Sequence, residues 1–221
     1  AIRQVIEQFG RYLGAALSRA HEVGDLRRDR DELESFVSQQ LRFPGVVGYS
    51  RAFRHALGTA LKAAESDLPI LIEGESGTGK DLVAQAVHAA SPRAERAFVA
   101  INCAALPAQL LESELFGHVK GAFTGAEKDR KGLLATADGG TLFLDEIAEM
   151  APGVQAKLLR TLQSGEFRPL GQDSLAQADV RVVVATRSNL SQQVAAGKFR
   201  EDLFYRLNTV CVRVPPLRER R

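Results

Sequence analysis

Five short segments of the chain are almost continuously apolar, and the stretches between them carry apolar residues at every third or fourth position. Continuous apolar runs are typical of strands buried on both faces of a parallel sheet, and the wider spacing is typical of amphipathic helices. Because the two patterns alternate, the sequence predicts an α/β fold with a parallel sheet covered by helices on both faces. The predicted strands are 68–74, 97–102, 141–146, 180–186 and 209–214, and the clearest helices are 81–90 and 154–163.

The amino-terminal part of the chain has a different pattern, in which apolar positions are spaced alternately by four and three up to Gly24 and a charged helical stretch follows. Two interpretations stay open: a solvated helix packed on its own domain, and a dimerising linker helix that transmits a signal. Pro44 and Gly45 end the helical pattern. We therefore predict a helical linker over residues 1–43 and an α/β domain over residues 44–221.

Composition is that of an ordinary globular protein, with 45% apolar and 25% charged residues. The net charge of +2 and the scattered Lys and Arg argue against direct DNA binding by this segment. Neither the two cysteines nor the four histidines have metal-site spacing. The sequence lacks an apolar run of 18 residues and a signal peptide, so we expect a cytoplasmic protein without membrane contact. It opens within a helical pattern and without Met, and we expect it to be a piece of a longer protein.

The stretch "GESGTGKD" joins the strand 68–74 to the helix 81–90. Its glycines allow backbone N–H groups to approach phosphate oxygens, the helix amino terminus adds positive potential, and Lys80 reaches the β- and γ-phosphates. This spacing predicts a phosphate-binding loop. Asp81 stands where the motif has a Ser or Thr for Mg²⁺, and an acidic side chain can hold the metal through water. The predicted nucleotide-binding residues are Gly74, Glu75, Ser76, Gly77, Thr78, Gly79, Lys80 and Asp81.

Two adjacent carboxylates, Asp145 and Glu146, end the predicted strand 141–146. A carboxylate at a strand end beside the phosphate loop suits Mg²⁺, so Asp145 joins Asp81 as a candidate metal ligand. Glu146 is then the candidate base that polarises the attacking water. An acidic pair after a strand is also a common helix cap, but Lys80 upstream favours the catalytic interpretation.

Two glycines bracket "AFT" within a segment with charged flanks, which predicts a loop with an apolar tip held out to solvent. The competing interpretation is a buried turn whose Phe fills the core of the domain. The loop residues are Gly121, Ala122, Phe123, Thr124, Gly125 and Ala126.

Together, these motifs and the stretches "KLLRTLQSGEFRPLG" and "FREDLFYRLNTVCVRVPPLRER" resemble the AAA+ domain of bacterial enhancer-binding proteins, the activators of sigma-54 RNA polymerase. The resemblance runs from about Val46 to Arg221, and the GAFTGA hexapeptide is highly specific to that family. It implies ATP and Mg²⁺ as ligands, hydrolysis in a homo-oligomer that ranges from a dimer to a hexameric ring, and contact of residues 121–126 with the sigma-54 holoenzyme.

The resemblance also implies roles for residues outside these motifs. Asn102 matches a switch Asn that reports the γ-phosphate to the GAFTGA loop through Glu146. Arg200 and Arg206 match a pair of arginines that reach the nucleotide of a neighbouring subunit; the alternative is a pair of surface arginines beside acidic residues. The sensor strand departs from the family, because Arg187 stands where an Asn is usual. Thr186 or Asn189 is the expected replacement for the missing amide, and hydrolysis is expected to be slow.

Members of that family continue past "PPLRER" into a helical lid and a helix-turn-helix that binds DNA, and neither is present in these residues. The amino-terminal helix resembles the end of a sensory domain of the GAF type with a signalling helix. Two functions stay open: an ATP-hydrolysing activator that remodels closed promoter complexes, and a nucleotide-gated scaffold that binds ATP and sigma-54 with little turnover. Arg187 is the feature that supports the second.

Overall fold

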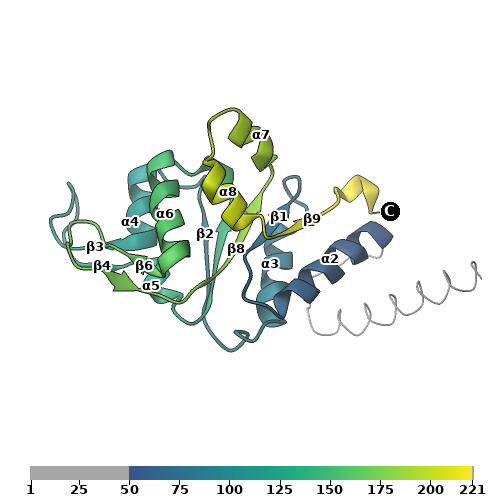
Figure 1. Ribbon diagram of the computed structural model, residues 1–221, viewed down its shortest axis with the longest axis horizontal. Helices are drawn as coiled ribbons and strands as arrows, with labels where there is room; N and C mark the ends of the chain where they lie inside the picture. Colours follow the sequence, from purple (N-terminus) through teal and green to yellow (C-terminus); the bar gives the residue numbers. More distant parts are fainter. Residues whose placement is uncertain (1–49, 221) are drawn as a thin grey trace, which may run out of the picture. The chain divides into compact units, whose positions relative to one another are not determined.

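The computed structural model describes residues 50–220, so the predicted linker over residues 1–43 lies outside the described residues. The five predicted strands form one parallel sheet in the order β2-β5-β8-β1-β9 (Figure 1). The predicted α/β fold is confirmed. The strand bounds are β1 Ile70–Glu73, β2 Phe98–Asn102, β5 Thr141–Asp145, β8 Arg181–Thr186 and β9 Val210–Arg213.

Helices fill the connections between the strands, and the two predicted helices correspond to α3 and α6. An additional helix, α2, precedes β1; the Oγ of Ser50 caps it by accepting a hydrogen bond from the Phe53 N–H at 3.4 Å. The helix bounds are α2 Arg51–Ala64, α3 Lys80–Ala89, α4 Ala108–Phe116, α5 Leu133–Thr136, α6 Pro152–Ser164, α7 Leu190–Ala195 and α8 Glu201–Leu207, with 3₁₀ turns η1 Ile147–Glu149 and η2 Leu217–Glu219.

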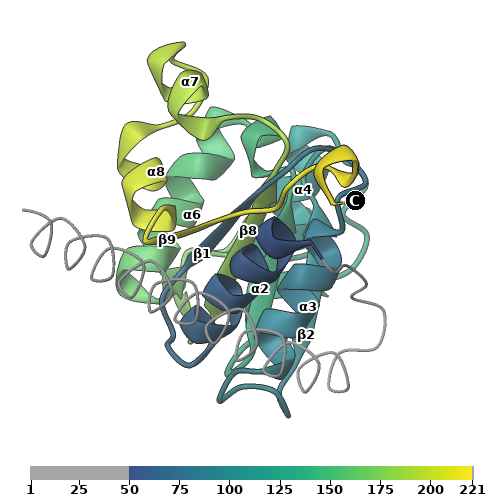
Figure 2. The same ribbon diagram turned by 90° about the vertical axis from the view of Figure 1, so that its right-hand side faces the viewer.

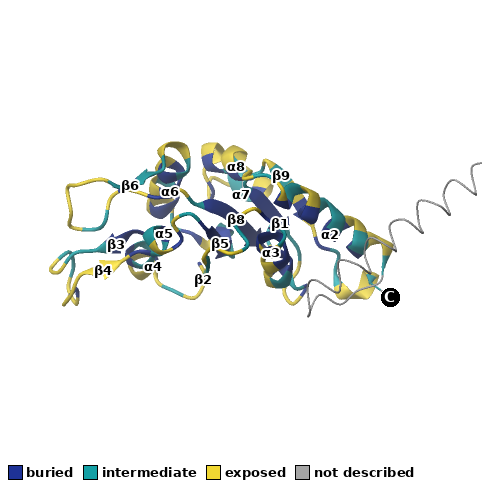
Figure 3. Ribbon diagram, turned by 90° about the horizontal axis from the view of Figure 1, so that it is seen from below, coloured by how far each residue is buried: buried dark blue, intermediate teal, exposed yellow. Residues whose placement is uncertain are grey.

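Helices cover both faces of the sheet, with α2 and α3 on one side and α6 and α8 on the other (Figure 2). Alternate strand residues such as Leu71, Leu144 and Val184 belong to the core cluster that also contains residues of α4, α6 and α8. On the opposite face, α3 contacts β1, β5 and β8. The central strands are therefore buried on both sides (Figure 3), which explains why their sequences are continuously apolar.

Two small antiparallel hairpins project from one end of the domain (Figure 1). The first pairs β3 Gly117–His118 with β4 Arg130–Lys131 and carries the GAFTGA loop; the second pairs β6 Glu166–Phe167 with β7 Ala176–Gln177. Of the helices that the structure describes, none combines the length and the apolar composition needed to cross a membrane.

Candidate functional site

The carboxyl ends of β1, β2, β5 and β8 bring the predicted site residues to one edge of the sheet. Asn102 and Asp145 are register partners at the ends of β2 and β5, and Glu73 and Thr186 are partners at the ends of β1 and β8. The phosphate loop follows Glu73 directly. This edge is the place where ligands bind in open α/β sheets.

The phosphate loop passes from β1 into α3 through Gly79, whose φ of 79° is in the left-handed region that suits glycine. Lys80 is buried, and its Nζ donates hydrogen bonds to the main-chain oxygens of Gly74 at 3.0 Å and Glu75 at 3.2 Å. The Thr78 hydroxyl donates to the same Glu75 oxygen at 2.8 Å. The lysine is thus held at the mouth of the loop by the loop's own backbone.

Glu146 has a strained backbone, with a φ of 50°, and it is the one non-glycine residue with a positive φ in the range 50–220. Such conformations cost about 1–3 kcal/mol and are concentrated at functional sites. The Glu146 N–H donates to the Asp145 Oδ1 at 2.9 Å. The Glu146 Oε1 lies 3.9 Å from the Lys80 Nζ, so the predicted base faces the phosphate loop.

Asn102 pairs with Asp145 rather than with Glu146. Its Nδ2 donates to the Asp145 Oδ2 at 3.2 Å, and its Oδ1 accepts from the Ala104 N–H at 2.8 Å. The structure thus joins Asn102 to Asp145, the residue that directly precedes Glu146. Glu146 instead accepts a hydrogen bond at 3.2 Å from the main-chain N–H of Arg187.

The residues at this edge fit a magnesium ion held mainly by phosphate and water. Mg²⁺ typically takes one or two protein carboxylates and completes its octahedron with phosphate oxygens and water. Asp145 lies at the strand end, and Asp81 is exposed in the first turn of α3. No cluster of three or more His, Cys, Asp or Glu side chains that could hold a metal by itself occurs between residues 50 and 220.

Neither expected replacement for the sensor amide points freely at the phosphate loop. Thr186 is fully buried, and its hydroxyl both donates to the Ser188 carbonyl at 3.2 Å and accepts from the Ser188 N–H at 3.0 Å. The Asn189 side chain caps α7 by accepting from the Gln192 N–H at 3.2 Å. The side chain of Arg187, which directly follows β8, is exposed, and its Nε lies 3.9 Å from the Glu146 Oε2.

The GAFTGA loop connects β3 and β4, whose backbones pack closely at Gly117. A Cβ atom on Gly117 would lie 2.6 Å from the Arg130 oxygen and 2.7 Å from the Gly132 nitrogen, so only glycine fits there. Within the loop, the Phe123 ring packs edge-on against His118 of β3, with 5.1 Å between the ring centroids. Thr124 is exposed, whereas Phe123 is half-buried. The exposed tip of the loop is therefore Thr124, and Phe123 packs against His118 of β3.

Comparison with known proteins agrees with this arrangement. Residues 46–213 match the family described as the sigma-54 interaction domain. This chain belongs to the sigma-54 interaction domain family. It is 55% identical over 193 residues to the Nif-specific regulatory protein of Azotobacter vinelandii, covering 87% of this chain and 37% of that protein. It is also 49% identical over 209 residues to the transcriptional regulatory protein ZraR of Salmonella typhimurium, covering 95% of this chain and 45% of that protein.

Among solved structures, NtrX from Brucella abortus in complex with ATP superposes with a TM-score of 0.74 at 38% identity, over 92% of this chain and 43% of that one. The chain thus spans less than half the length of these relatives. A P-loop NTPase domain from Escherichia coli, at 22% identity and a TM-score of 0.53, shares the fold.

Two arginines after β9 contact the phosphate loop of this sigma-54 interaction domain, and sequence reasoning missed both. The Arg218 guanidinium donates to both oxygens of Glu75 at 2.7 and 2.8 Å and lowers the pKa of that carboxyl. Arg220 donates to the Thr78 main-chain oxygen at 2.7 Å and lies 4.2 Å from the centroid of the Phe53 ring. The sequence carried no signal for these contacts, because they depend on β9 lying beside β1, a strand order that only the structure shows.

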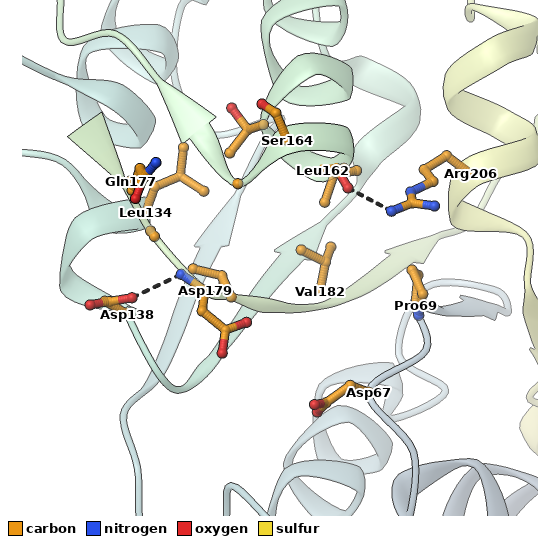
Figure 4. Close-up of a pocket in the computed structure, with 14 residues that line it drawn as sticks. Asp67, Pro69, Leu134, Asp138, Leu162, Ser164, Gln177, Asp179, Val182 and Arg206 are labelled. Carbon is orange, nitrogen blue, oxygen red and sulfur yellow. Dashed lines mark hydrogen bonds between the residues drawn. The ribbon is translucent and has the colours of Figure 1, made fainter. Parts of the chain in front are cut away.

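Arg206, one of the two expected trans-acting arginines, lies at the opposite edge of the sheet from the phosphate loop. Its Nη2 donates to the Leu162 main-chain oxygen at 2.7 Å at the rim of a cavity of about 600 Å³ (Figure 4). That cavity is also lined by Asp67, Asp138 and Asp179, which precede β1, β5 and β8. Arg206 therefore points away from the nucleotide site of its own chain.

Arg200, the second arginine, precedes α8 and forms a two-point contact with Asp202, from Nε at 3.0 Å and from Nη2 at 2.7 Å. This pairing lowers the pKa of the Asp202 carboxyl. The surface-pair alternative thus describes Arg200 in this structure, whereas Arg206 has a main-chain partner.

Proposed function

We propose that this chain is the ATP-hydrolysing domain of a transcriptional activator that remodels closed promoter complexes of sigma-54 RNA polymerase. The observation that carries the proposal is the position of Glu146, which faces the buried Lys80 of the phosphate loop at 3.9 Å. This cluster lies in the same domain as a GAFTGA loop. The relatives are named as regulatory proteins, and NtrX was solved in complex with ATP; both support the same function.

In the proposed reaction, the N–H groups of the loop and the Lys80 ammonium bind the β- and γ-phosphates of ATP. Glu146 orients the attacking water and takes its proton. Asp145, with Asp81 through water, would hold Mg²⁺, which neutralises charge on the phosphates. Asp145 also fixes Asn102, whose position at the end of β2 makes it the residue that reports the state of the site to the segment that leads into the GAFTGA loop.

Arg206 acts on a neighbouring subunit in this proposal, in an assembly of identical subunits up to a hexameric ring. Its support is geometric, because the side chain lies at the edge of the sheet remote from the chain's own phosphate loop. A guanidinium supplied in trans neutralises charge that develops on the γ-phosphate. Arg200 is the second candidate for this role. To reach the phosphate of a neighbouring subunit, its guanidinium would first have to leave Asp202.

The Lys80→Ala variant tests the proposed function. Because the phosphates lose their principal cation, we expect ATP binding and phosphate release to fall to background. Lys198→Ala, which removes an exposed lysine near α8, is the matched control and should behave like the parent. Undiminished ATP affinity and phosphate release in Lys80→Ala would exclude the phosphate-loop assignment.

A second function, a nucleotide-gated scaffold with little turnover, is favoured by one observation: Arg187 occupies the sensor position and contacts Glu146. Steady-state phosphate release by the full-length protein distinguishes the two. Turnover that increases with protein concentration supports the hydrolysing activator, whereas tight ATP binding with negligible release supports the scaffold.

A further inference from the structure

The Glu146 carboxylate lies between two cations. One oxygen, Oε1, is 3.9 Å from the Lys80 Nζ, and the other, Oε2, is 3.9 Å from the Arg187 Nε. A single carboxylate group therefore separates the arginine side chain from the lysine of the phosphate loop. Both cations thus lie against the same carboxylate, one at each of its oxygens.

Two different parts of Arg187 contact Glu146, and they are separable. The main-chain N–H makes the shorter contact, at 3.2 Å, and it does not depend on the identity of the side chain. The guanidinium makes only the longer contact with Glu146 and a second one, at 3.5 Å, with Glu149. Because 57% of the Arg187 side chain is exposed, these ion pairs are partly screened by water, and a phosphate group competes well for the guanidinium.

We propose that the Arg187 side chain binds the γ-phosphate of the nucleotide in its own subunit. This inference rests on the proposed binding of ATP at the phosphate loop. When a nucleoside triphosphate occupies the loop, the guanidinium exchanges the Glu146 carboxylate for a terminal phosphate oxygen. The planar fork of arginine matches phosphate geometry and forms charge-assisted hydrogen bonds.

This exchange frees the carboxylate of Glu146, the proposed general base. Glu146 loses a cationic neighbour but keeps the N–H of Arg187 and its own left-handed backbone, so its orientation persists while its carboxylate becomes free for the attacking water. A nucleoside diphosphate has no terminal group at that position and leaves the guanidinium on Glu146. Arg187 thus distinguishes triphosphate from diphosphate.

The test compares binding of ADP and of a non-hydrolysable ATP analogue to the parent chain, to Arg187→Gln and to Arg187→Lys. We expect Arg187→Gln to bind the analogue about tenfold more weakly or worse, the usual effect of losing a hydrogen bond to a charged group. Its ADP affinity should stay within about twofold of the parent, and Arg187→Lys should recover part of the loss. Arg160→Gln, which neutralises an exposed arginine of α6, is the matched control.

Equal losses for both nucleotides, or no loss for either, would overturn the assignment, because neither result singles out the γ-phosphate. Tighter binding of the analogue by Arg187→Gln would also overturn it and would make the arginine an obstacle. If the folded parent binds neither nucleotide, the phosphate loop itself has failed, and the proposed function falls with this inference. Equal melting temperatures for the parent and the variants confirm that folding is unchanged.

Discussion

Asn102 donates a hydrogen bond from Nδ2 to the Asp145 Oδ2 at 3.2 Å, and this bond ties the end of β2 to the end of β5. The same asparagine accepts a hydrogen bond from the Ala104 N–H and so shapes the start of the connection to α4. One side chain thereby joins the carboxylate proposed to hold the metal to the segment that leads to the GAFTGA loop.

Replacing Asn102 with Ala should uncouple the loop from the nucleotide. Because both of its hydrogen bonds are exposed, we expect a stability loss of about 1 kcal/mol and ATP affinity near that of the parent. Binding to sigma-54 should no longer respond to ATP. Pull-down of sigma-54 with and without a non-hydrolysable ATP analogue measures this, and a normal nucleotide response in the variant would contradict the proposed connection.

The Glu146→Gln variant should bind ATP and hydrolyse it poorly. An amide cannot accept the proton of the attacking water, and loss of a general base typically lowers the rate about 10²–10⁴-fold. Glutamine keeps the shape of the side chain and the backbone strain, so the melting temperature should change little. ATP affinity and single-turnover phosphate release are the measurements. Turnover at the rate of the parent would assign the base to another residue.

Phe123→Ala separates contact with the partner from catalysis. Because Phe123 is half-buried against His118, its loss should cost less than the 3–5 kcal/mol typical of a fully buried Phe. ATP hydrolysis should persist, while ATP-dependent sigma-54 binding and open-complex formation should fail, since an anchoring aromatic commonly contributes about 2 kcal/mol or more to an interface. A variant that unfolds, or one that still opens promoters, refutes the loop assignment.

Mixed assemblies test whether Arg206 acts in trans. Arg206→Ala alone should lose about 10³–10⁵-fold in hydrolysis, the usual value of an arginine supplied by a neighbour. Lys80→Ala should also be inactive. When the two variants are mixed, a subunit with intact Lys80 can receive Arg206 from its neighbour, so part of the activity should return. A mixture that stays inactive, although the subunits demonstrably co-assemble, would argue for action within one chain.

Stability should fall between neutral and mildly acidic pH through His88. This histidine is buried in α3, its Nδ1 lies 2.9 Å from the Thr141 hydroxyl, and burial lowers its pKa from the ordinary 6.5. The unfolded chain therefore binds the proton more tightly, so stability is full above the ordinary pKa and is lost as pH falls toward the lowered one. Melting temperatures of the parent and of His88→Gln at pH 7.5 and 5.5 measure this. The variant should show the smaller decrease.

The sheet and the phosphate loop could be predicted from sequence because their signals are local. Continuous apolar runs identified all five strands, and the spacing of glycines to Lys80 identified the loop. The contacts of Arg218 and Arg220 could not be predicted, since they join residues more than 140 positions apart and depend on β9 lying beside β1. The left-handed backbone of Glu146 carries no local signal at all.

The GAFTGA loop likewise could be predicted from sequence only in part. Its two glycines and its charged flanks predicted a projecting loop, and the hairpin of β3 and β4 agrees with that prediction. The direction of the Phe123 ring is decided instead by His118, whose Nδ1 is paired at 2.7 Å with the Ser113 hydroxyl of α4. The orientation of the Phe123 ring thus depends on the folded hairpin and could not be predicted from the pattern of residues.

The length of α4 suits the transmission of movement from the nucleotide site to the loop that the proposed function requires. Its nine residues form a rod about 13 Å long that starts six positions after Asn102 and ends where the tightly packed Gly117 begins the hairpin. Tilting such a rod by a few degrees at its amino end moves its other end by about 1 Å, and the projecting loop extends the lever arm further. In the proposed mechanism, a small change at a strand end would therefore be amplified into a larger displacement of Thr124.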